Sequence, residues 1–188
     1  MSELLDLTMD EAEDKMKTTV SVFQQDLQGL RGNRASTSLV DRLMVDYYGQ
    51  QTELRKLANI STPESMTIQI RPFDPGAVKA IETAINQADL GVNPNTDSGI
   101  VRLNMPALTR ERRQELVKAL GKMAETARVS IRNIRRDAMK DIKDLEKDGE
   151  IGEDASTRAQ DNIQEYTDKY IGQIDEMSKD KEEDILAV

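Results

Sequence analysis

The fold is decided by residues 116–145, which read LVKALGKMAETARVSIRNIRRDAMKDIKDL. Apolar positions recur through this stretch at a mean spacing of about 3.6 residues, which is the period of a straight α-helix. They are Leu116, Leu120, Met123, Ala127, Ile131, Ile134, Ala138, Ile142 and Leu145. The pattern predicts one long helix with a single apolar face, capped at its start by Thr109 and ended by the glycines of residues 148–152.

Two further stretches show the same period. Thr8 followed by Glu11 is typical of a capping box and predicts a first helix over residues 9–30, which Gly32 and Asn33 end. A last helix near the C-terminus would return antiparallel to the long one. The two stripes are Met16, Val20, Phe23, Leu27 and Leu30, and then Ala159, Ile163, Tyr166, Tyr170, Ile174 and Met177. Each helix has one apolar face to bury, so we expect an antiparallel three-helix bundle.

Between the first two helices the period changes to two, which indicates half-buried strands. The alternating apolar positions are Leu43, Val45, Tyr47, Ile68 and Ile70. Pro75 then begins a short helical stripe that ends near Gly91. Strand-like pieces at Val92 and at residues 100–103 follow, separated by the turn-rich residues 93–99.

These elements predict an α+β protein with two domains. Residues 1–30 and 106–188 would form the discontinuous bundle, and residues 31–105 would form a small β/α/β domain inserted into it. Two short connectors would join the domains and allow relative rotation, because small interfaces within a chain usually permit motion.

Composition narrows the function classes. The 188-residue chain has no Cys, His or Trp, which removes disulfides, thiolate nucleophiles, imidazole bases and the usual zinc ligands. We therefore expect a cytoplasmic protein without a metal or cofactor. The apolar runs are short and the N-terminus is acidic, so neither a membrane span nor a signal peptide is expected.

The net charge of −9 argues at first against nucleic acid as a partner, but the charge is unevenly distributed. Residues 105–148 hold 12 basic and 8 acidic side chains, whereas residues 149–188 hold 4 and 12. Positive charge that is concentrated in one segment can form a local binding surface on an acidic protein.

Three arginines stand out within the basic segment. Arg128, Arg132 and Arg135 are spaced at i, i+4 and i+7 beside the apolar stripe, and Arg136 follows them directly. A guanidinium group can donate two hydrogen bonds to one phosphate and keeps its charge at every working pH. The stripe favours phosphate binding, most simply to RNA. A solvated face, pairs with the acidic last helix and an acidic protein partner are open alternatives.

Several motifs in order give the chain a close resemblance to bacterial ribosome recycling factor over essentially its full length. The matching stretches are Arg31-Gly32-Asn33-Arg34-Ala35-Ser36, Val45-Asp46-Tyr47-Tyr48-Gly49, Asp89-Leu90-Gly91-Val92-Asn93-Pro94, Leu108-Thr109-Arg110-Glu111-Arg112-Arg113 and residues 128–138. The chain has Gly32-Asn33 where the family commonly has Thr-Gly, and Pro106-Ala107 where it has Pro-Pro.

The resemblance implies an L-shaped monomer that is not an enzyme. Such a protein binds near the subunit interface of the post-termination ribosome and, with elongation factor G and GTP, promotes its dissociation into subunits with release of mRNA and tRNA. The family's contacts with large-subunit ribosomal RNA would fall on Arg132 and Arg135, with Arg128 as a weaker candidate. Its hinge would fall on Arg31, Gly32, Asn33 and Arg34 and on Asn104, Met105 and Pro106.

Two other function classes rank lower. A helical adaptor or chaperone would use the arginine stripe to bind an acidic protein, and it would do so without the ribosome. A carboxylate-based hydrolase would need converging acidic groups, and clusters such as Glu182-Glu183-Asp184 are more typical of a solvated helix.

Overall fold

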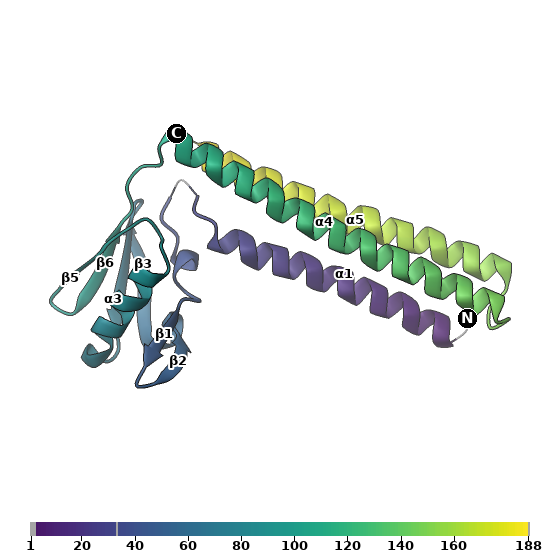
Figure 1. Ribbon diagram of the computed structural model, residues 1–188, viewed down its shortest axis with the longest axis horizontal. Helices are drawn as coiled ribbons and strands as arrows, with labels where there is room; N and C mark the ends of the chain where they lie inside the picture. The colour runs from purple at the N-terminus through teal and green to yellow at the C-terminus, as the bar shows by residue number, and fades with distance from the viewer. Residues whose placement is uncertain (1–2, 33, 188) are drawn as a thin grey trace. The chain divides into compact units, whose positions relative to one another are not determined.

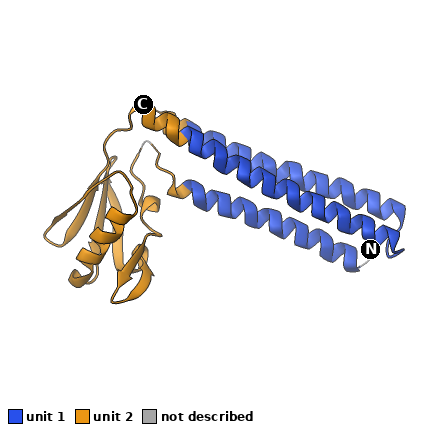
Figure 2. Ribbon diagram, viewed as in Figure 1, with its two compact units in different colours: residues 1–27, 117–182 blue, residues 28–116, 183–188 orange. Residues whose placement is uncertain are grey.

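The computed structural model describes residues 3–32 and 34–187, and it forms two compact units (Figure 2). The first holds residues 1–27 and 117–182, and the second holds residues 28–116 and 183–188. This division assigns one end of each of the three long helices to the second unit rather than to the bundle. The domain boundaries expected at residues 30 and 106 stay a prediction.

Helix α1 spans Glu3–Gly29 (Figure 1). The predicted start at Thr8 is wrong, because the helix is already formed five residues earlier. The Thr8 hydroxyl donates to the carbonyl of Leu4 at 2.9 Å, as it would inside a helix, rather than capping a terminus. Leu5 and Ala12 are 3% and 4% exposed, so their burial extends the apolar stripe and stabilises the extra turn.

Helices α4, Arg110–Lys147, and α5, Glu153–Leu186, run side by side and are joined by a tight turn in which Gly149 has φ 78°. The Arg112 N–H donates to the Thr109 hydroxyl at 3.2 Å, as expected for an N-cap. All three helices contribute to one core cluster of Leu5, Ala12, Ala138, Ile142, Ile151, Ala159 and Ile163. The predicted three-helix bundle is therefore confirmed, and with it the α+β class.

The second unit contains two antiparallel sheets and the helix α3, Val78–Gln87. The smaller sheet pairs β1, Met44–Tyr47, with β2, Gln50–Glu53. The larger sheet has the order β3-β4-β6-β5, with bounds Ala58–Glu64, Thr67–Pro72, Ile100–Asn104 and Pro94–Asp97. Short helical turns at Thr37–Leu39, Leu54–Leu57 and Pro75–Ala77 connect these elements.

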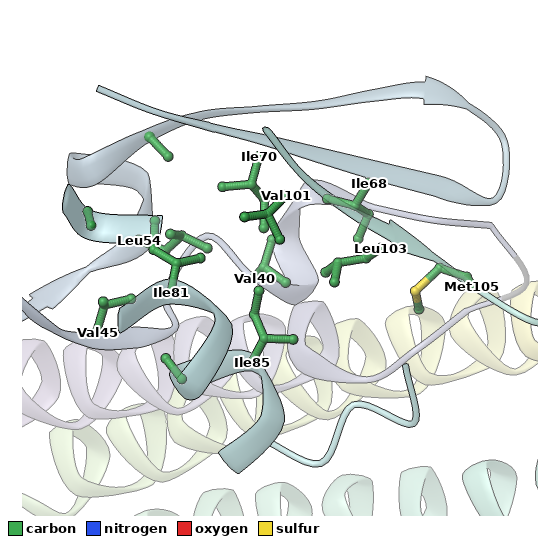
Figure 3. Close-up of a cluster of buried hydrophobic side chains, with 13 residues drawn as sticks. Val40, Val45, Leu54, Ile68, Ile70, Ile81, Ile85, Val101, Leu103 and Met105 are labelled. Carbon is green, nitrogen blue, oxygen red and sulfur yellow. The ribbon is translucent and has the colours of Figure 1, made fainter. Parts of the chain in front are cut away.

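The core of the second unit is aliphatic, as Figure 3 shows. Ile68, Ile70, Val101 and Leu103 from the larger sheet meet Ile81 and Ile85 from α3. The alternation predicted for Val45, Ile68 and Ile70 is confirmed, since each is fully buried.

The predicted turn over residues 93–99 is wrong. Residues Pro94–Asp97 form β5, which pairs with β6, and the reversal needs only Ser98 and Gly99, with φ 51° and 78°. Val92 lies outside any strand, contrary to expectation. Asn, Pro and Asp have low strand propensity, so pairing with β6 outweighs local preference here.

Candidate nucleic-acid interface

Helix α4 is a straight scaffold of 38 residues, roughly 55 Å long at 1.5 Å per residue. Its buried face fixes its orientation in the bundle, because Leu120, Ala124 and Ile131 are no more than 1% exposed. Side chains on the remaining circumference are therefore held at fixed positions on a rigid rod.

The first of the predicted arginines, Arg128, bonds to two carboxylates of the bundle. Its Nε donates to Asp175 Oδ1 on α5 at 2.7 Å, and its NH1 donates to Glu125 at 3.2 Å. The hydrogen bond to Asp175 is the main cause of a raised pKa for Arg128. The side chain is only 28% exposed, so this guanidinium group joins α4 to α5.

Arg132 and Arg135 differ in their partners. An Arg132 NH2 donates to Glu125 Oε1, and this bond is the main cause of a lowered pKa for Glu125. Arg132 is 43% exposed. Arg135 NH1 donates to Gln164 Oε1 on α5 at 3.1 Å. The spacing thus placed the three arginines correctly on one side of α4, but it could not reveal Glu125 and Asp175 as partners.

A larger group of cations on α4 was missed at the level of sequence. At 3.6 residues per turn, seven basic side chains fall within a sector of roughly 80° of the helix circumference. All seven are exposed, and we call them the basic face: Lys118, Lys122, Arg132, Arg136, Lys140, Lys143 and Lys147. The signal that would have found them is the angular position of every charge on the helix, rather than proximity to the apolar stripe.

Acidic side chains of α4 lie mostly on another side. Asp137 and Asp141 are close enough to Lys15 of α1 to contribute to its raised pKa, of which the hydrogen bond to Glu11 is the main cause. Glu111 and Glu125 share the sector of the basic face, but Glu125 is bonded to Arg128 and Arg132, and Glu111 lies in the first turn of α4, before the first of the seven cations. The basic face therefore presents a dense row of positive charge to an anion.

Electrostatic attraction of this kind suits a phosphate backbone more than a small substrate. A row of cations along a rod can contact successive phosphates, each of which adds to affinity by releasing counterions. Within the described residues no group of three acidic side chains gathers as a possible metal site.

The residues expected to form the hinge have specific contacts. An Arg31 NH2 donates to the carbonyl of Pro106, so the two connectors are bonded to each other. The Met105 N–H donates to Met66 at 2.7 Å, and Asn104 is the last residue of β6. Arg34 is exposed, and Asn33 lies outside the described residues.

Gly32 lies close to the side chain of Asp184. A Cβ atom at this position would lie 1.8 Å from Asp184 Oδ2, so a larger residue would require that carboxylate to move. This contact gives no evidence of motion between the connectors. The hinge therefore stays a prediction.

Over the residues that the structure describes, none of the helices combines the length and the apolar character that crossing a lipid bilayer requires.

Comparison with known proteins points to one family. The model of the family described as "Ribosome recycling factor" matches residues 23–186. A ribosome-recycling factor of Picosynechococcus sp. is 49% identical over 182 residues, which are 97% of this chain and 100% of the relative. That of Thermosynechococcus vestitus is 50% identical over 178 residues, covering 95% of this chain and 98% of the relative.

Solved structures agree. One described as "Solution structure of the ribosome recycling factor" superposes with a TM-score of 0.84 at 42% identity and covers 100% of both chains. A second contains the T. thermophilus ribosome recycling factor and the E. coli elongation factor G bound to the E. coli post-termination complex. Its TM-score is 0.69 at 39% identity, with coverage of 97% of this chain and 99% of that chain.

Proposed function

The chain belongs to the ribosome recycling factor family, and on this premise we propose that it binds the post-termination ribosome and, with elongation factor G and GTP, promotes its dissociation into subunits. Release of mRNA and tRNA accompanies the dissociation. The single observation that carries the proposal is family membership over nearly the whole chain. The solved relative bound with elongation factor G to a post-termination complex supports the same partners.

The bundle is the part that anchors to large-subunit ribosomal RNA. Arg132 and Arg135 make the central contacts, and the basic face, to which Arg132 belongs, extends them along α4. A guanidinium group carries five N–H donors, so Arg132 keeps its bond to Glu125 and still donates to a phosphate. Arg128 contributes less directly, because its bond to Asp175 holds α4 and α5 together beneath the contact.

The protein carries out no bond chemistry of its own. The inserted domain, residues 31–105, receives the action of elongation factor G, while residues 1–30 and 106–188 stay on the RNA. The connectors at Arg31 to Arg34 and at Asn104 to Pro106 act as the hinge between them. The protein works as a monomer in the cytoplasm, where ribosomes are found.

Sedimentation of post-termination ribosomes tests the function and the anchor together. Ribosomes are incubated with the protein, elongation factor G and GTP, and free subunits are quantified. The anchor variant is Arg132→Ala, Arg135→Ala. A matched control, Lys15→Ala, Arg158→Ala, removes the same charge from exposed positions on α1 and α5.

Subunit release by the wild type and by the control, together with its loss in the anchor variant, is the expected result. Removing two phosphate contacts should also lower the slope of log affinity against log salt by about 1.4. No release by the wild type would overturn the proposed function. Equal release by the anchor variant would overturn the role of the arginines and leave the function standing.

A further inference from the structure

The larger sheet of the second unit has two unlike faces. Ile68, Ile70, Val101 and Leu103 point into the core that α3 covers. The Thr96 hydroxyl donates to Glu82 of α3, so β5 has the same orientation. Since successive side chains of a strand alternate, the residues between these lie on the opposite face.

That opposite face carries two arginines on neighbouring strands. Gln69 of β4 pairs with Arg102 of β6, and Ile70 pairs with Val101. Arg71 is therefore the diagonal neighbour of Arg102, at a Cβ separation of about 7 Å or less. Both side chains are exposed. Within the described part of the chain, no carboxylate forms an ion pair with either one.

Another exposed cation of the second unit, Arg55, differs in this respect. Arg55 forms an ion pair with Glu53. The same carboxylate has a lowered pKa, mainly from its hydrogen bond to Arg55, with smaller contributions from Lys56 and Arg42. An ordinary solvated surface of an acidic protein mixes its charges in this way. Arg71 and Arg102 instead place two like charges on neighbouring strands, and an anion bound between them would relieve their mutual repulsion.

Most side chains around the two arginines are neutral and polar. Register places Asn59 beside Arg71, and it places Gln69 and Asn95 on either side of Arg102, with Ser61 beyond Gln69. The acidic Asp97 of the edge strand is separated from Arg71 by Ile100, but it is the diagonal neighbour of Arg102 across β5 and β6. Amide and hydroxyl groups can donate to phosphate and to ribose hydroxyls.

The composition of this face decides between two kinds of partner. Protein interfaces depend on aromatic or large apolar residues at their centre, and between its strands this face presents the half-buried Ile100. Nucleic-acid interfaces are more polar and more positively charged. The exposed ring of Phe73, two residues beyond Arg71, lies at the end of this face and can stack on a base of any kind, because such stacking does not read sequence.

We propose that the outer face of the β3-β4-β6-β5 sheet is a second RNA-binding surface, in which Arg71 and Arg102 contact the phosphates of one ribosomal RNA strand without regard to its sequence. The proposal rests on the proposed function and adds to it a contact made by the inserted domain itself. This contact is independent of the basic face of α4.

The test combines ribosome binding over a range of salt concentrations with hydroxyl-radical footprinting of ribosomal RNA. The variant is Arg71→Gln, Arg102→Gln in the full chain. The control, Arg42→Gln, Lys56→Gln, removes the same charge from exposed residues of the same unit that neighbour Glu53. All four side chains are exposed, so circular dichroism melting should be nearly unchanged in both proteins.

The variant should lower the salt slope of ribosome binding by about 1.4 and should lose one set of RNA protections. The control should keep both. An unchanged slope and footprint would overturn the proposal. So would a loss of affinity with every RNA protection intact, because that result assigns the face to an acidic protein.

The footprint separates this proposal from the proposed function. A wild-type protein that protects RNA but releases no subunits would overturn the function, and the protections lost in the variant would still support the sheet contact. Normal subunit release, with no RNA protection that depends on Arg71 and Arg102, would support the function and overturn the sheet contact.

Discussion

The two units bury their cores in different ways. The bundle seam is long and contains many small or polar buried side chains, among them Ala12, Ala124, Ala127, Ala138, Ala159, Ser156 and Thr167. The buried cluster of the second unit is compact and dominated by branched aliphatic residues, with no polar member. A seam of small residues lets helices approach closely and leaves a large outer surface for charge, whereas a compact aliphatic core depends on each large side chain.

The largest expected effect is a cavity in the second unit. Ile81→Ala removes a fully buried side chain of α3, and it should lower the free energy of unfolding of that unit by about 2–5 kcal/mol. Hydrogen exchange should accelerate at amides of residues 40–105 and stay slow in α4 and α5. Ile81→Val, as the conservative control, should cost about 0.5–1.5 kcal/mol. If hydrogen exchange accelerated equally in both units, the units would unfold as one body, and the contrast between their cores would have no effect on stability.

The same contrast explains what the sequence could predict. A helix shows its buried face through a local period, so the stripe from Leu116 to Leu145 predicted α4 and its orientation from one stretch of chain. Strand β5 gave no such signal, because its stability comes from pairing with β6 and its residues have low strand propensity. The start of α1 was missed for a related reason, because Leu5 is buried by residues of α4 and α5 that are distant in the sequence.

The candidate site shows the same limit. The spacing of Arg128, Arg132 and Arg135 places them on one side of α4, which is local information. The partner of Arg128 is Asp175, 47 residues away on α5, and only the packed bundle brings the two together. The diagonal of Arg71 and Arg102 depends on strand register, which the alternation of side chains alone does not give.

A second and smaller effect is expected from overpacking the bundle. Ala138→Leu adds volume to a seam position that is 5% exposed, and it should lower the free energy of unfolding by about 1–3 kcal/mol. Ala and Leu have similar helix propensity, so the change isolates packing. Urea unfolding followed by circular dichroism measures it. Lys140→Leu adds the same side chain at an exposed position of α4 and should change stability by less than about 0.5 kcal/mol. If Ala138→Leu were equally mild, the seam would not be closely packed.

The smallest effect concerns a polar contact at the bundle seam, comparable to the hydrogen bond from Tyr47 to Asp74 beside the core of the second unit. The Tyr170 hydroxyl on α5 donates to Glu13 Oε1 on α1 at 2.7 Å. Burial, and then this hydrogen bond, raises the pKa of Tyr170 to about 12 from 10.0. Tyr170→Phe should cost about 1 kcal/mol at neutral pH, where the phenol is protonated in both the folded and unfolded states.

Alkaline pH should remove that difference. Because the pKa of Tyr170 is raised on folding, its contribution is complete below pH 10 and is lost as the pH rises toward about 12. Lys17 and Lys169 face the same carboxylate, so the decisive quantity is the difference in urea midpoint between wild type and Tyr170→Phe at each pH. That difference should shrink from pH 9 to pH 11. A difference that stays constant would mean that ionisation of Tyr170 is not coupled to folding, and a difference near zero at every pH would mean that the hydroxyl contributes nothing beyond the ring.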